Sequence, residues 1–236
     1  MRNPVKTLKT NSIGTINMLD LSRRLNSKIL IASSSEVYGD PLEHPQKESY
    51  FGNVNPMGPR SCYDEGKRVA ESLAYSYWKH ENISIRVARI FNTYGPRMNI
   101  EDGRVVSNFI TQALKNEPIT VYGNGKQTRS FQYVSDLVSG LISLMNSNVT
   151  KPVNLGNPDE YTIIDFAKKI RNRLKSKSEI VFLAEVIDDP KRRRPSIDLA
   201  IKRLHWRPTV ELDKGMELTV DYFKRALDSQ NETDYF

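Results

Sequence analysis

The chain contains 236 residues, a length that suits one large domain or a domain with a smaller lobe. Hydrophobic residues make up 38% and charged residues 27%, which allows a packed core and excludes wholesale disorder. The net charge of +7 fits an anionic ligand or an ordinary basic surface, and no nucleic-acid-binding motif accompanies it. The single cysteine, Cys62, excludes an internal disulfide and a cysteine-based metal site, so no metal is expected. No apolar run is long enough to predict a membrane span, and the N-terminus lacks the apolar core of a secretory signal.

The first hundred residues alternate between helical and extended patterns. Residues 5–25 carry apolar side chains mostly at helical spacing, and 28–32 form a short apolar run typical of a buried parallel strand. A polar stretch rich in proline and glycine follows, then a helical segment over 62–80 and a β-branched run over 83–90. Strand, helix and strand in this order predict an α/β fold with a parallel sheet.

The pattern changes after Asn92 into shorter pieces. Helices are predicted over 105–114, 136–145, 163–174 and 213–227, and short strands over 119–122, 129–134, 153–155 and 180–182. These pieces indicate a smaller mixed lobe that rests on the sheet domain. The sheet domain is therefore assigned to 1–103 and the lobe mainly to 104–227, with some returns to the sheet. Residues 228–236 are predicted to be a flexible tail.

Tyr63 and Lys67 form a Y-x-x-x-K pair on the helix predicted over 62–80. Four residues make about one helical turn, so both side chains lie on one face. A nearby ammonium is expected to lower the phenol pKa and make the tyrosine an acid/base for a hydroxyl group. The serine turn that begins at Ser33 follows a predicted strand, at the end of the sheet where α/β proteins bind ligands.

Long blocks of the sequence carry a family resemblance. They are I-A-S-S-S-E-V-Y-G-D from Ile31, C-Y-D-E-G-K-R-V-A-E from Cys62, V-A-R-I-F-N-T-Y-G-P-R-M from Val87, D-G-R-V-V-S-N-F-I from Asp102 and V-Y-G-N-G-K-Q-T-R-S-F-Q-Y-V-S-D from Val121. With them the chain resembles the nucleotide-sugar branch of the extended short-chain dehydrogenase/reductase family, from Asn3 to about Leu227. The resemblance implies part of a Rossmann-like doubly wound parallel sheet with a smaller mixed α/β substrate lobe. It also implies NAD as cofactor and a homodimer that packs 7–25 and 62–80 of two subunits into a four-helix bundle.

The residues around Glu36 separate the activities within this branch. The 4,6-dehydratases carry Thr-Asp-Glu where this chain has Ser34-Ser35-Glu36, and the 4-epimerases usually lack a carboxylate at the last position. Decarboxylases have Ser-Glu there and an arginine before a basic residue and proline, which Arg193 matches. The resemblance therefore implies NAD-dependent decarboxylation of UDP-glucuronate to UDP-xylose through a UDP-4-keto intermediate. A UDP-glucuronate 4-epimerase, a nucleotide-sugar dehydratase and a non-catalytic dimerising subunit are the open alternatives.

The resemblance implies a role for individual residues of the matched blocks. Tyr63, assisted by Lys67 and Ser34, would remove the C4 hydroxyl proton while hydride passes to NAD. Glu36 and Arg193 would position the carboxylate and manage protonation at C5. Further cofactor contacts are expected at Ala32, Thr10, Thr93 and Arg104. Substrate contacts are expected at Lys9, Asn17, Ser35, Tyr63, Asn92, Ser107, Asn108, Tyr122, Arg129 and Arg193.

One part of the family pattern has no match in the 236 residues. The G-x-x-G-x-x-G loop, which binds the cofactor pyrophosphate at a helix N-terminus, is not found among the 12 glycines. The chain is therefore expected to be N-terminally truncated, with weak NAD binding and little activity alone. The strand over 28–32 is expected to have an open apolar edge. The family resemblance places animal members in the Golgi lumen and others in the cytoplasm, and no membrane segment is predicted in this chain.

Overall fold

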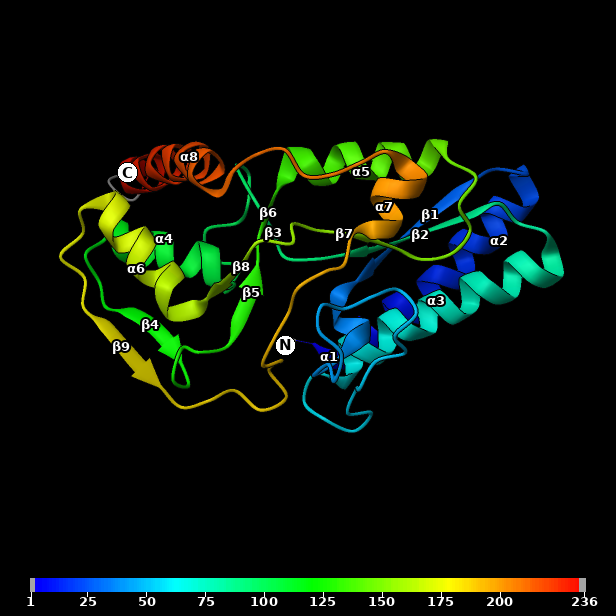
Figure 1. The fold of residues 1–236 in the computed structure, drawn as a ribbon, viewed down its shortest axis with the longest axis horizontal. Coiled ribbons are helices and arrows are strands. Elements are labelled where there is room, and N and C mark those ends of the chain that lie inside the picture. The colour runs from blue at the N-terminus through cyan, green and yellow to red at the C-terminus, as the bar shows by residue number, and fades with distance from the viewer. Residues whose placement is uncertain (1–2, 234–236) are drawn as a thin grey trace.

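A short parallel sheet forms the centre of one half of the molecule, and a mixed α/β lobe forms the other half (Figure 1). The computed structural model describes residues 3–233. The sheet contains β1 (Ile29–Ser34), β2 (Ile85–Ile90) and β7 (Val153–Leu155), in the order β1-β2-β7 with both pairings parallel. This arrangement confirms the expected α/β class.

The N-terminal helical segment is one rod with a wider turn in its middle. It consists of α1 (Pro4–Lys9), the π-helical turn η1 (Thr10–Gly14) and α2 (Thr15–Leu25). The side chain of Asn3 accepts a hydrogen bond from Lys6 N at 3.0 Å and caps the first turn, and the left-handed Asn26 ends the rod. Single π turns occur often at functional sites, and this one begins at Thr10, a residue expected to contact the cofactor.

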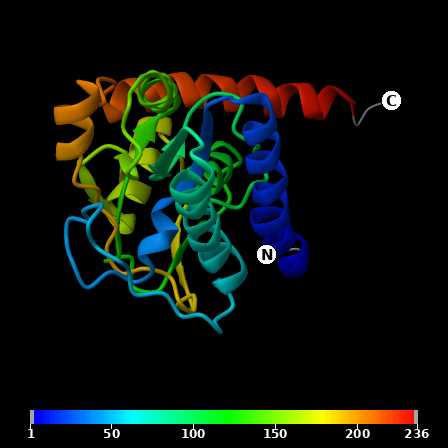
Figure 2. The ribbon, with the colours of Figure 1, turned by 90° about the vertical axis from the view of Figure 1, so that its right-hand side faces the viewer.

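Alternating side chains of the sheet pack against helices on both faces. Ile85 and Val87 of β2 join a core with Ala70 and Ala74 of α3 (Ser61–Glu81), whereas Ala88 faces a second core that contains Trp206. Helices α2 and α3 lie side by side next to the first face (Figure 2). The second face is covered by α5 (Val134–Asn146) and α7 (Asp198–Leu204). The period of two along β2 is what a strand buried on both faces requires.

Strand β1 lies at the edge of this sheet. Within residues 3–233 it pairs only with β2, over the register from Ile29↔Ile85 to Ser34↔Ile90. The expected open edge is therefore present in the part of the chain that the structure describes.

The second lobe is built mostly as predicted. Its elements are β3 (Thr93–Tyr94), α4 (Val105–Leu114), β4 (Ile119–Tyr122), β5 (Thr128–Ser130), β6 (Gln132–Tyr133), β8 (Glu160–Thr162), α6 (Ile163–Leu174), β9 (Ile180–Leu183) and α8 (Leu212–Thr233). Strands β4 and β9 pair in parallel, and α4, α6 and α8 enclose a core in which the rings of Phe131 and Phe166 stack with centroids 4.3 Å apart. Helix α6 begins where Thr162 accepts a hydrogen bond from Asp165 N at 3.1 Å.

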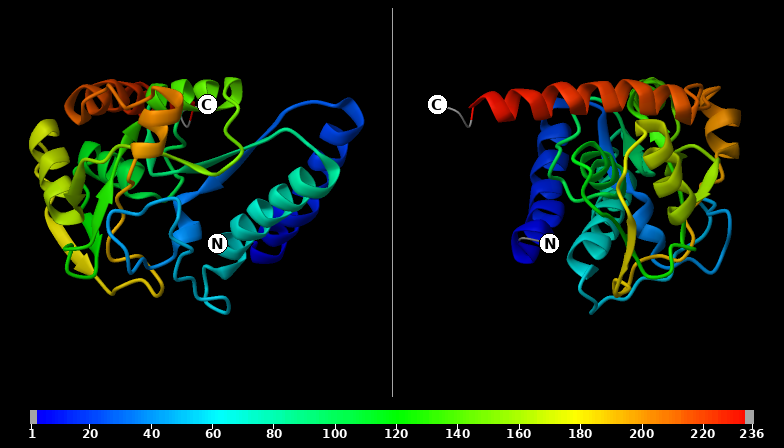
Figure 3. Two further views of the ribbon diagram at one scale, coloured as in Figure 1. Left: turned by 45° about the vertical axis from the view of Figure 1, so that its right-hand side comes forward. Right: turned by 90° about the vertical axis from the view of Figure 1, so that its left-hand side faces the viewer.

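Three features of the lobe differ from the prediction. The single strand expected over 129–134 is two strands, because β5 pairs antiparallel with β8 whereas β6 pairs in parallel with β3. Strand β8 and helix α7 were not predicted, since each is short and has no clear periodicity. Helix α8 continues to Thr233, past the expected end at Leu227, and it extends beyond the body of the molecule (Figure 3). The last part of the expected tail, 234–236, lies outside the described residues, and the domain division at residue 103 stays a prediction.

No helix among the described residues is long and apolar enough to cross a membrane.

Candidate functional site

The carboxyl end of β1 leads into a short turn that carries several of the expected residues. Ser34 ends the strand, and its hydroxyl accepts a hydrogen bond from Glu36 N at 3.2 Å, which starts the 3₁₀ turn η2 (Ser35–Tyr38). Gly39 ends this turn at a φ of +61°, where a side chain would overlap the backbone of Asn53. Ser34 and Glu36 are therefore held beside the first turn of α3.

Tyr63 and Lys67 lie on one face of α3, next to this turn. The Lys67 Nζ lies 5.6 Å from the centroid of the Tyr63 ring and donates a hydrogen bond to the Ala32 carbonyl at 2.9 Å. The Y-x-x-x-K pair, Ser34 and Ala32 are thus brought together as the sequence predicted.

The pKa of Tyr63 does not follow the expectation. Burial raises the pKa of the phenol above its ordinary value, and the hydrogen bond with Ser34 only partly opposes this effect. Burial also lowers the pKa of Lys67, whose ammonium is directed to the Ala32 carbonyl. The expected lowering of the phenol pKa is therefore not found in this structure: desolvation is the largest effect, and the positive charge that opposes it is that of Arg104.

Beside Tyr63 lies a partly buried group of four charged residues, Glu36, Arg60, Asp64 and Arg193, which we call the charge cluster. The Glu36 Oε2 accepts hydrogen bonds from Arg60 Nη2 at 2.8 Å and from Arg193 Nη2 at 3.3 Å. Burial by itself would raise the pKa of Glu36, but Arg193 and Arg60 hold it below its ordinary value. The expected neighbours Glu36 and Arg193 therefore meet, although 157 positions separate them in the chain.

Arg193 is the most deeply buried cation of the charge cluster, with 1% of its side chain exposed. Its guanidinium donates to the Ser35 carbonyl and, at 2.9 Å, to the Gly39 carbonyl, so it joins the turn η2 on two sides. Burial lowers the pKa of Arg193, and Glu36 opposes this effect. Ser35, expected to contact the substrate, is itself 2% exposed.

Gln46 fixes the segment that carries Arg193. Its backbone N–H donates to the Arg194 carbonyl, its carbonyl accepts from Ser196 N, and its side-chain Oε1 accepts from Arg194 N, each at 2.8 Å. Gln46 is completely buried, so these bonds are shielded from water. They set the position of Arg193 relative to Glu36.

Two members of the charge cluster were not predicted from the sequence. Arg60 is the residue before α3, and Asp64 follows Tyr63 in the same first turn. Burial first, and then the charge of Glu36, raise the pKa of Asp64 to about 6, whereas Arg60 and Arg193 act in the opposite direction. Asp64 stood in the block quoted for the resemblance, but only its burial beside Glu36 marks it as a site residue.

Arg129, one of the expected substrate contacts, occupies β5 near the charge cluster. Its Nη2 donates to Asp189 Oδ2 at 2.8 Å and its Nη1 donates to the Pro190 carbonyl at 2.7 Å. Asp189 is thus a partner that the sequence analysis did not find. Arg129 is 9% exposed, and its charge contributes to lowering the pKa of Glu36.

Three other expected contact residues lie at the ends of elements: Asn92 and Thr93 follow β2 in the chain, and Arg104 precedes α4. Thr93 Oγ1 accepts from Gln132 Nε2 at 3.1 Å, and the Asn92 carbonyl accepts from Gln132 N at 2.9 Å. The exposed side chain of Arg104 forms an ion pair with Asp102, and its charge lowers the pKa of Tyr63.

Three further expected substrate contacts, Ser107, Asn108 and Tyr122, differ in exposure. Ser107 is fully buried and its hydroxyl donates to Asp102 Oδ1 at 2.6 Å. Asn108 donates to the Gly103 carbonyl, and Tyr122, at the end of β4, is 44% exposed.

Lys9 and Thr10 lie at the junction of α1 and η1, and Asn17 lies on α2. Both junction residues are exposed, and η1 packs closely against α3, where a Cβ on Gly66 would lie 3.1 Å from the Asn11 Cβ. Asn17 is exposed and lines a cavity of about 300 Å³ with Asp20, Leu21 and Arg24, away from the charge cluster.

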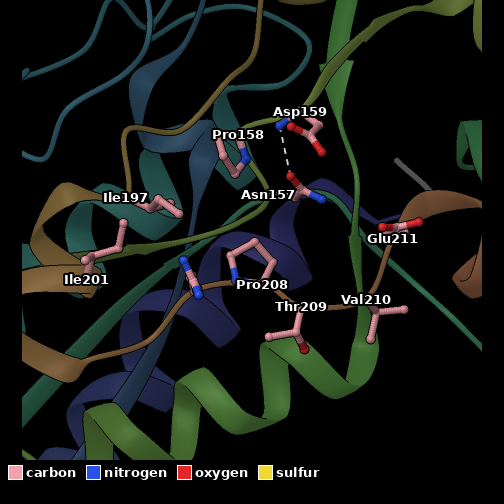
Figure 4. A pocket seen from close by; sticks show the side chains of 10 residues that line it. Asn157, Pro158, Asp159, Ile197, Ile201, Pro208, Thr209, Val210 and Glu211 are labelled. Carbon is pink, nitrogen blue, oxygen red and sulfur yellow. Dashed lines mark hydrogen bonds between the residues drawn. The ribbon is translucent and has the colours of Figure 1, made fainter.

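A second cavity, of about 320 Å³, contains none of the expected residues. Figure 4 shows it between the loop after β7, with Asn157 and Asp159, and the segment from Pro208 to Glu211 that leads into α8. Asp159 N donates to Asn157 Oδ1 at 2.9 Å, so the loop is fixed by its own bonds. No cluster of three or more His, Cys, Asp or Glu side chains that could hold a metal occurs within residues 3–233.

Comparison with known proteins establishes the family. A family model described as GDP-mannose 4,6 dehydratase matches residues 1–219. The chain belongs to this family. The sequence resemblance to nucleotide-sugar enzymes of the extended short-chain dehydrogenase/reductase type is therefore confirmed.

Several relatives carry one name. A protein from Danio rerio called UDP-glucuronic acid decarboxylase 1 is 60% identical over 235 residues, which cover 100% of this chain and 56% of the relative. UDP-glucuronic acid decarboxylase 3 from Arabidopsis thaliana is 57% identical over 225 residues, which cover 95% of this chain and 66% of that protein. The chain thus spans a little over half of the first relative's length.

Solved structures of the same fold belong to more distant relatives. UDP-glucose 4-epimerase from Thermotoga maritima, with UDP-glucose, is 26% identical at a TM-score of 0.90, covering 96% of this chain and 73% of that one. UDP-glucuronic acid 4-epimerase from Bacillus cereus, in complex with UDP-glucuronic acid and NAD, is 27% identical at a TM-score of 0.82, covering 93% and 68%. These likenesses confirm the Rossmann-type fold class that the sequence predicted.

Proposed function

We propose that this chain provides the acid–base and sugar-binding part of an NAD-dependent UDP-glucuronate decarboxylase that forms UDP-xylose. The observation that carries the proposal is the placement of Glu36 and Arg193 against each other beside Tyr63. The relatives called UDP-glucuronic acid decarboxylase, at 53 to 60% identity, support the same activity. The epimerase structures, at 26 to 27% identity, are more distant.

The residues beside Tyr63 fit the nicotinamide end of NAD. Among the hydrogen bonds of the described residues, Lys67 Nζ donates one, to Ala32, and an ammonium has three donors. The other two are free for ribose hydroxyls, and the exposed Ala32 leaves room beside them. When bound, NAD would accept a hydride from the sugar and later return it.

The chemistry of this chain's own residues begins with a proton at the C4 hydroxyl. Tyr63 would take this proton, and the hydrogen bond with Ser34 would hold the phenol oxygen in place. The raised phenol pKa means that the base form must be stabilised by further positive charge when substrate is bound. Lys67, one turn away, is the cation placed to do so.

The next steps concern the sugar carboxylate. A carboxylate β to the C4 carbonyl loses CO₂ with the electrons passing to an enolate, and C5 then takes up a proton. Arg193 and Glu36 would orient the carboxylate, because a guanidinium binds it in a bidentate manner. The deep burial of Arg193 lowers the local dielectric and strengthens this contact.

Mass spectrometry of the nucleotide sugar tests the proposal. The 236-residue chain is incubated with NAD⁺ and UDP-glucuronate, alone and after extension at its N-terminus with a glycine-rich phosphate-loop segment. UDP-xylose from either protein is the expected product, with the larger yield from the extended chain. Tyr63→Phe should lower the rate by about 10² to 10⁴, because it removes the acid/base oxygen and little volume.

Other products would contradict the proposal in distinct ways. UDP-galacturonate would indicate a 4-epimerase. Binding of the chain to a full-length homologue without turnover by the extended chain would indicate a non-catalytic subunit.

We also propose a homodimer through the α1–α2 rod and α3. Apolar side chains on the rod are unusually exposed, among them Met18 at 54%, Leu21 at 45% and Leu25 at 66%. Sedimentation velocity should give a dimer, and Leu21→Asp should give a monomer; a wild-type monomer would overturn this assembly. For location, the Golgi lumen in an animal and the cytoplasm elsewhere are the compartments we propose, to be tested by imaging the tagged protein.

A further inference from the structure

Asp64 is a buried carboxylate with one oxygen that bonds to nothing among the described residues. Its side chain is 8% exposed, its Oδ2 lies 3.9 Å from Arg60 Nε, and its Oδ1 has no hydrogen-bond partner. The Nε atoms of Arg60 and Arg193 are likewise buried without a partner. Unsatisfied buried polar atoms are costly, so three of them around one carboxylate pair indicate a site built for more than stability.

The charges of the cluster balance only in the ligand-free arrangement. Two guanidinium groups, on Arg60 and Arg193, face two carboxylates, on Glu36 and Asp64. A sugar carboxylate that binds Arg193 adds a third negative charge to this buried group. A buried excess charge is expensive, and the usual response is that the weakest acid takes up a proton.

Asp64 is the weakest acid of the cluster. Its pKa is raised to about 6, whereas the pKa of Glu36 is held below its ordinary value by two arginines. The groups that face Asp64 come from every neighbouring element: Glu36 from η2, Arg60 and Tyr63 from the start of α3, and Arg193 and Asp188 from the segment before α7. Of these, Tyr63 and both arginines have pKa values far above neutrality, so they do not exchange protons near pH 7.

We propose that Asp64 takes up a proton from solvent when an acidic sugar nucleotide binds, so that the cluster can hold the incoming carboxylate without excess negative charge. This inference rests on the proposed function, because it assumes a uronate ligand at Arg193. It assigns to Asp64 a charge-compensating role and no contact with the reacting atoms. It also makes the preference of the site for an acidic sugar depend on pH, because a neutral sugar on the same nucleotide binds without proton uptake.

Isothermal titration calorimetry of the full chain in buffers of different ionisation enthalpy measures the proton count directly. UDP-glucuronate and UDP-glucose are compared at pH 7, where neither ligand titrates. UDP-glucuronate should bind with uptake of more than about half a proton, and UDP-glucose with almost none. Between pH 6 and 8 the affinity for UDP-glucuronate relative to UDP-glucose should fall, by at most about tenfold per pH unit.

Asp64→Asn assigns the proton to its residue. Proton uptake and the pH dependence of the affinity ratio should both disappear in this variant, and Glu65→Gln, next to it and more exposed, should keep both. Equal uptake for the two ligands, or uptake retained in Asp64→Asn, would overturn the role of Asp64 and leave the proposed function intact. Binding of UDP-glucose without UDP-glucuronate, or of neither, would overturn the proposed function and this inference with it. The wild-type comparison of two ligands does not depend on how the variants fold.

Discussion

Two arginine–carboxylate groups join α3 to the carboxyl end of the sheet, and they are built differently. Arg89 meets Glu71 through two bonds, Nε to Oε1 at 2.9 Å and Nη2 to Oε2 at 2.7 Å. Its remaining Nη1 donates to the Tyr38 hydroxyl and to the Glu48 carbonyl, and Ser33 donates to Glu71. The charge cluster around Glu36, by contrast, leaves Arg60 Nε, Arg193 Nε and Asp64 Oδ1 unpaired.

The difference separates a structural pair from the group that we propose binds the sugar carboxylate. Where every guanidinium nitrogen has an acceptor, as at Arg89, the group fixes β2 to α3 and offers little to a ligand. Where donors remain, as at Arg193, a ligand that completes the bonds gains free energy that folding did not use. The two groups share Tyr38 and η2 as neighbours, so their contrast is open to matched substitutions.

The largest loss of stability is expected at the pair of Arg89 and Glu71. Glu71→Gln leaves the buried Arg89 without its carboxylate, and loss of one partner of a buried pair costs about 3–5 kcal/mol of unfolding free energy. Urea denaturation measures this loss. A loss below about 1 kcal/mol would contradict the structural role of the pair.

A smaller change in the unfolding free energy is expected when pH changes the ionisation of Asp64. Its pKa of about 6 in the folded state lies above the ordinary 3.8, so the folded chain binds this proton more tightly than the unfolded chain. The contribution to stability is therefore complete below about pH 4 and is lost as the pH rises through 6. The unfolding free energy of the wild type minus that of Asp64→Asn should fall by about 2 kcal/mol between pH 4 and 7. A difference that does not change with pH would show that the carboxyl titrates normally.

Arg193→Met removes an arginine from the charge cluster, and its effects can be compared with those of Glu71→Gln at the structural pair. Glu36 keeps Arg60 at 2.8 Å, so the stability cost should be only about 1–2 kcal/mol, mainly from the unpaired carbonyls of Ser35 and Gly39. Affinity for UDP-glucuronate should fall at least tenfold, and affinity for UDP-glucose should stay the same. Thermal unfolding and calorimetry measure the two quantities, with the exposed Arg192→Met as control. Equal loss of both ligands would argue against carboxylate recognition by Arg193.

The smallest effect is expected at the exposed pair of Arg23 and Glu81, which are 3.2 Å apart and about half exposed. Glu81→Gln should leave the urea midpoint unchanged, because solvent and salt screen such a pair. A shift as large as that of Glu71→Gln would mean that burial does not explain the contrast.

Local sequence patterns predicted most of the helices and strands. The bounds of α4, β4, β7 and α6 agree with their predicted ranges, because each has a regular apolar period and clear turn residues at its ends. The seven residues of α7 bury only Ala200, and β8 depends on its pairing with β5, so neither leaves a local signal.

The site was predictable only in part. The run that contains Arg192, Arg193 and Arg194 looks uniformly basic, yet the first is exposed and the second is 1% exposed. Only the family pattern selected Arg193. Arg60 and Asp64 belong to the site because distant segments bury them, which no local pattern reports, and the raised pKa of Tyr63 has the same origin.

The hydrogen bonds between Gln46 and residues 194–196 determine when Arg193 joins the charge cluster during synthesis. A ribosome releases Glu36, Arg60 and Asp64 well before the segment that carries Arg193, and closing so long a loop has a high entropic cost. During that interval Arg60 is the arginine of the cluster available to neutralise Glu36. Since Arg193 enters only when its segment docks on Gln46, the charge cluster is completed by one of the late segments of the chain, together with α7 and α8.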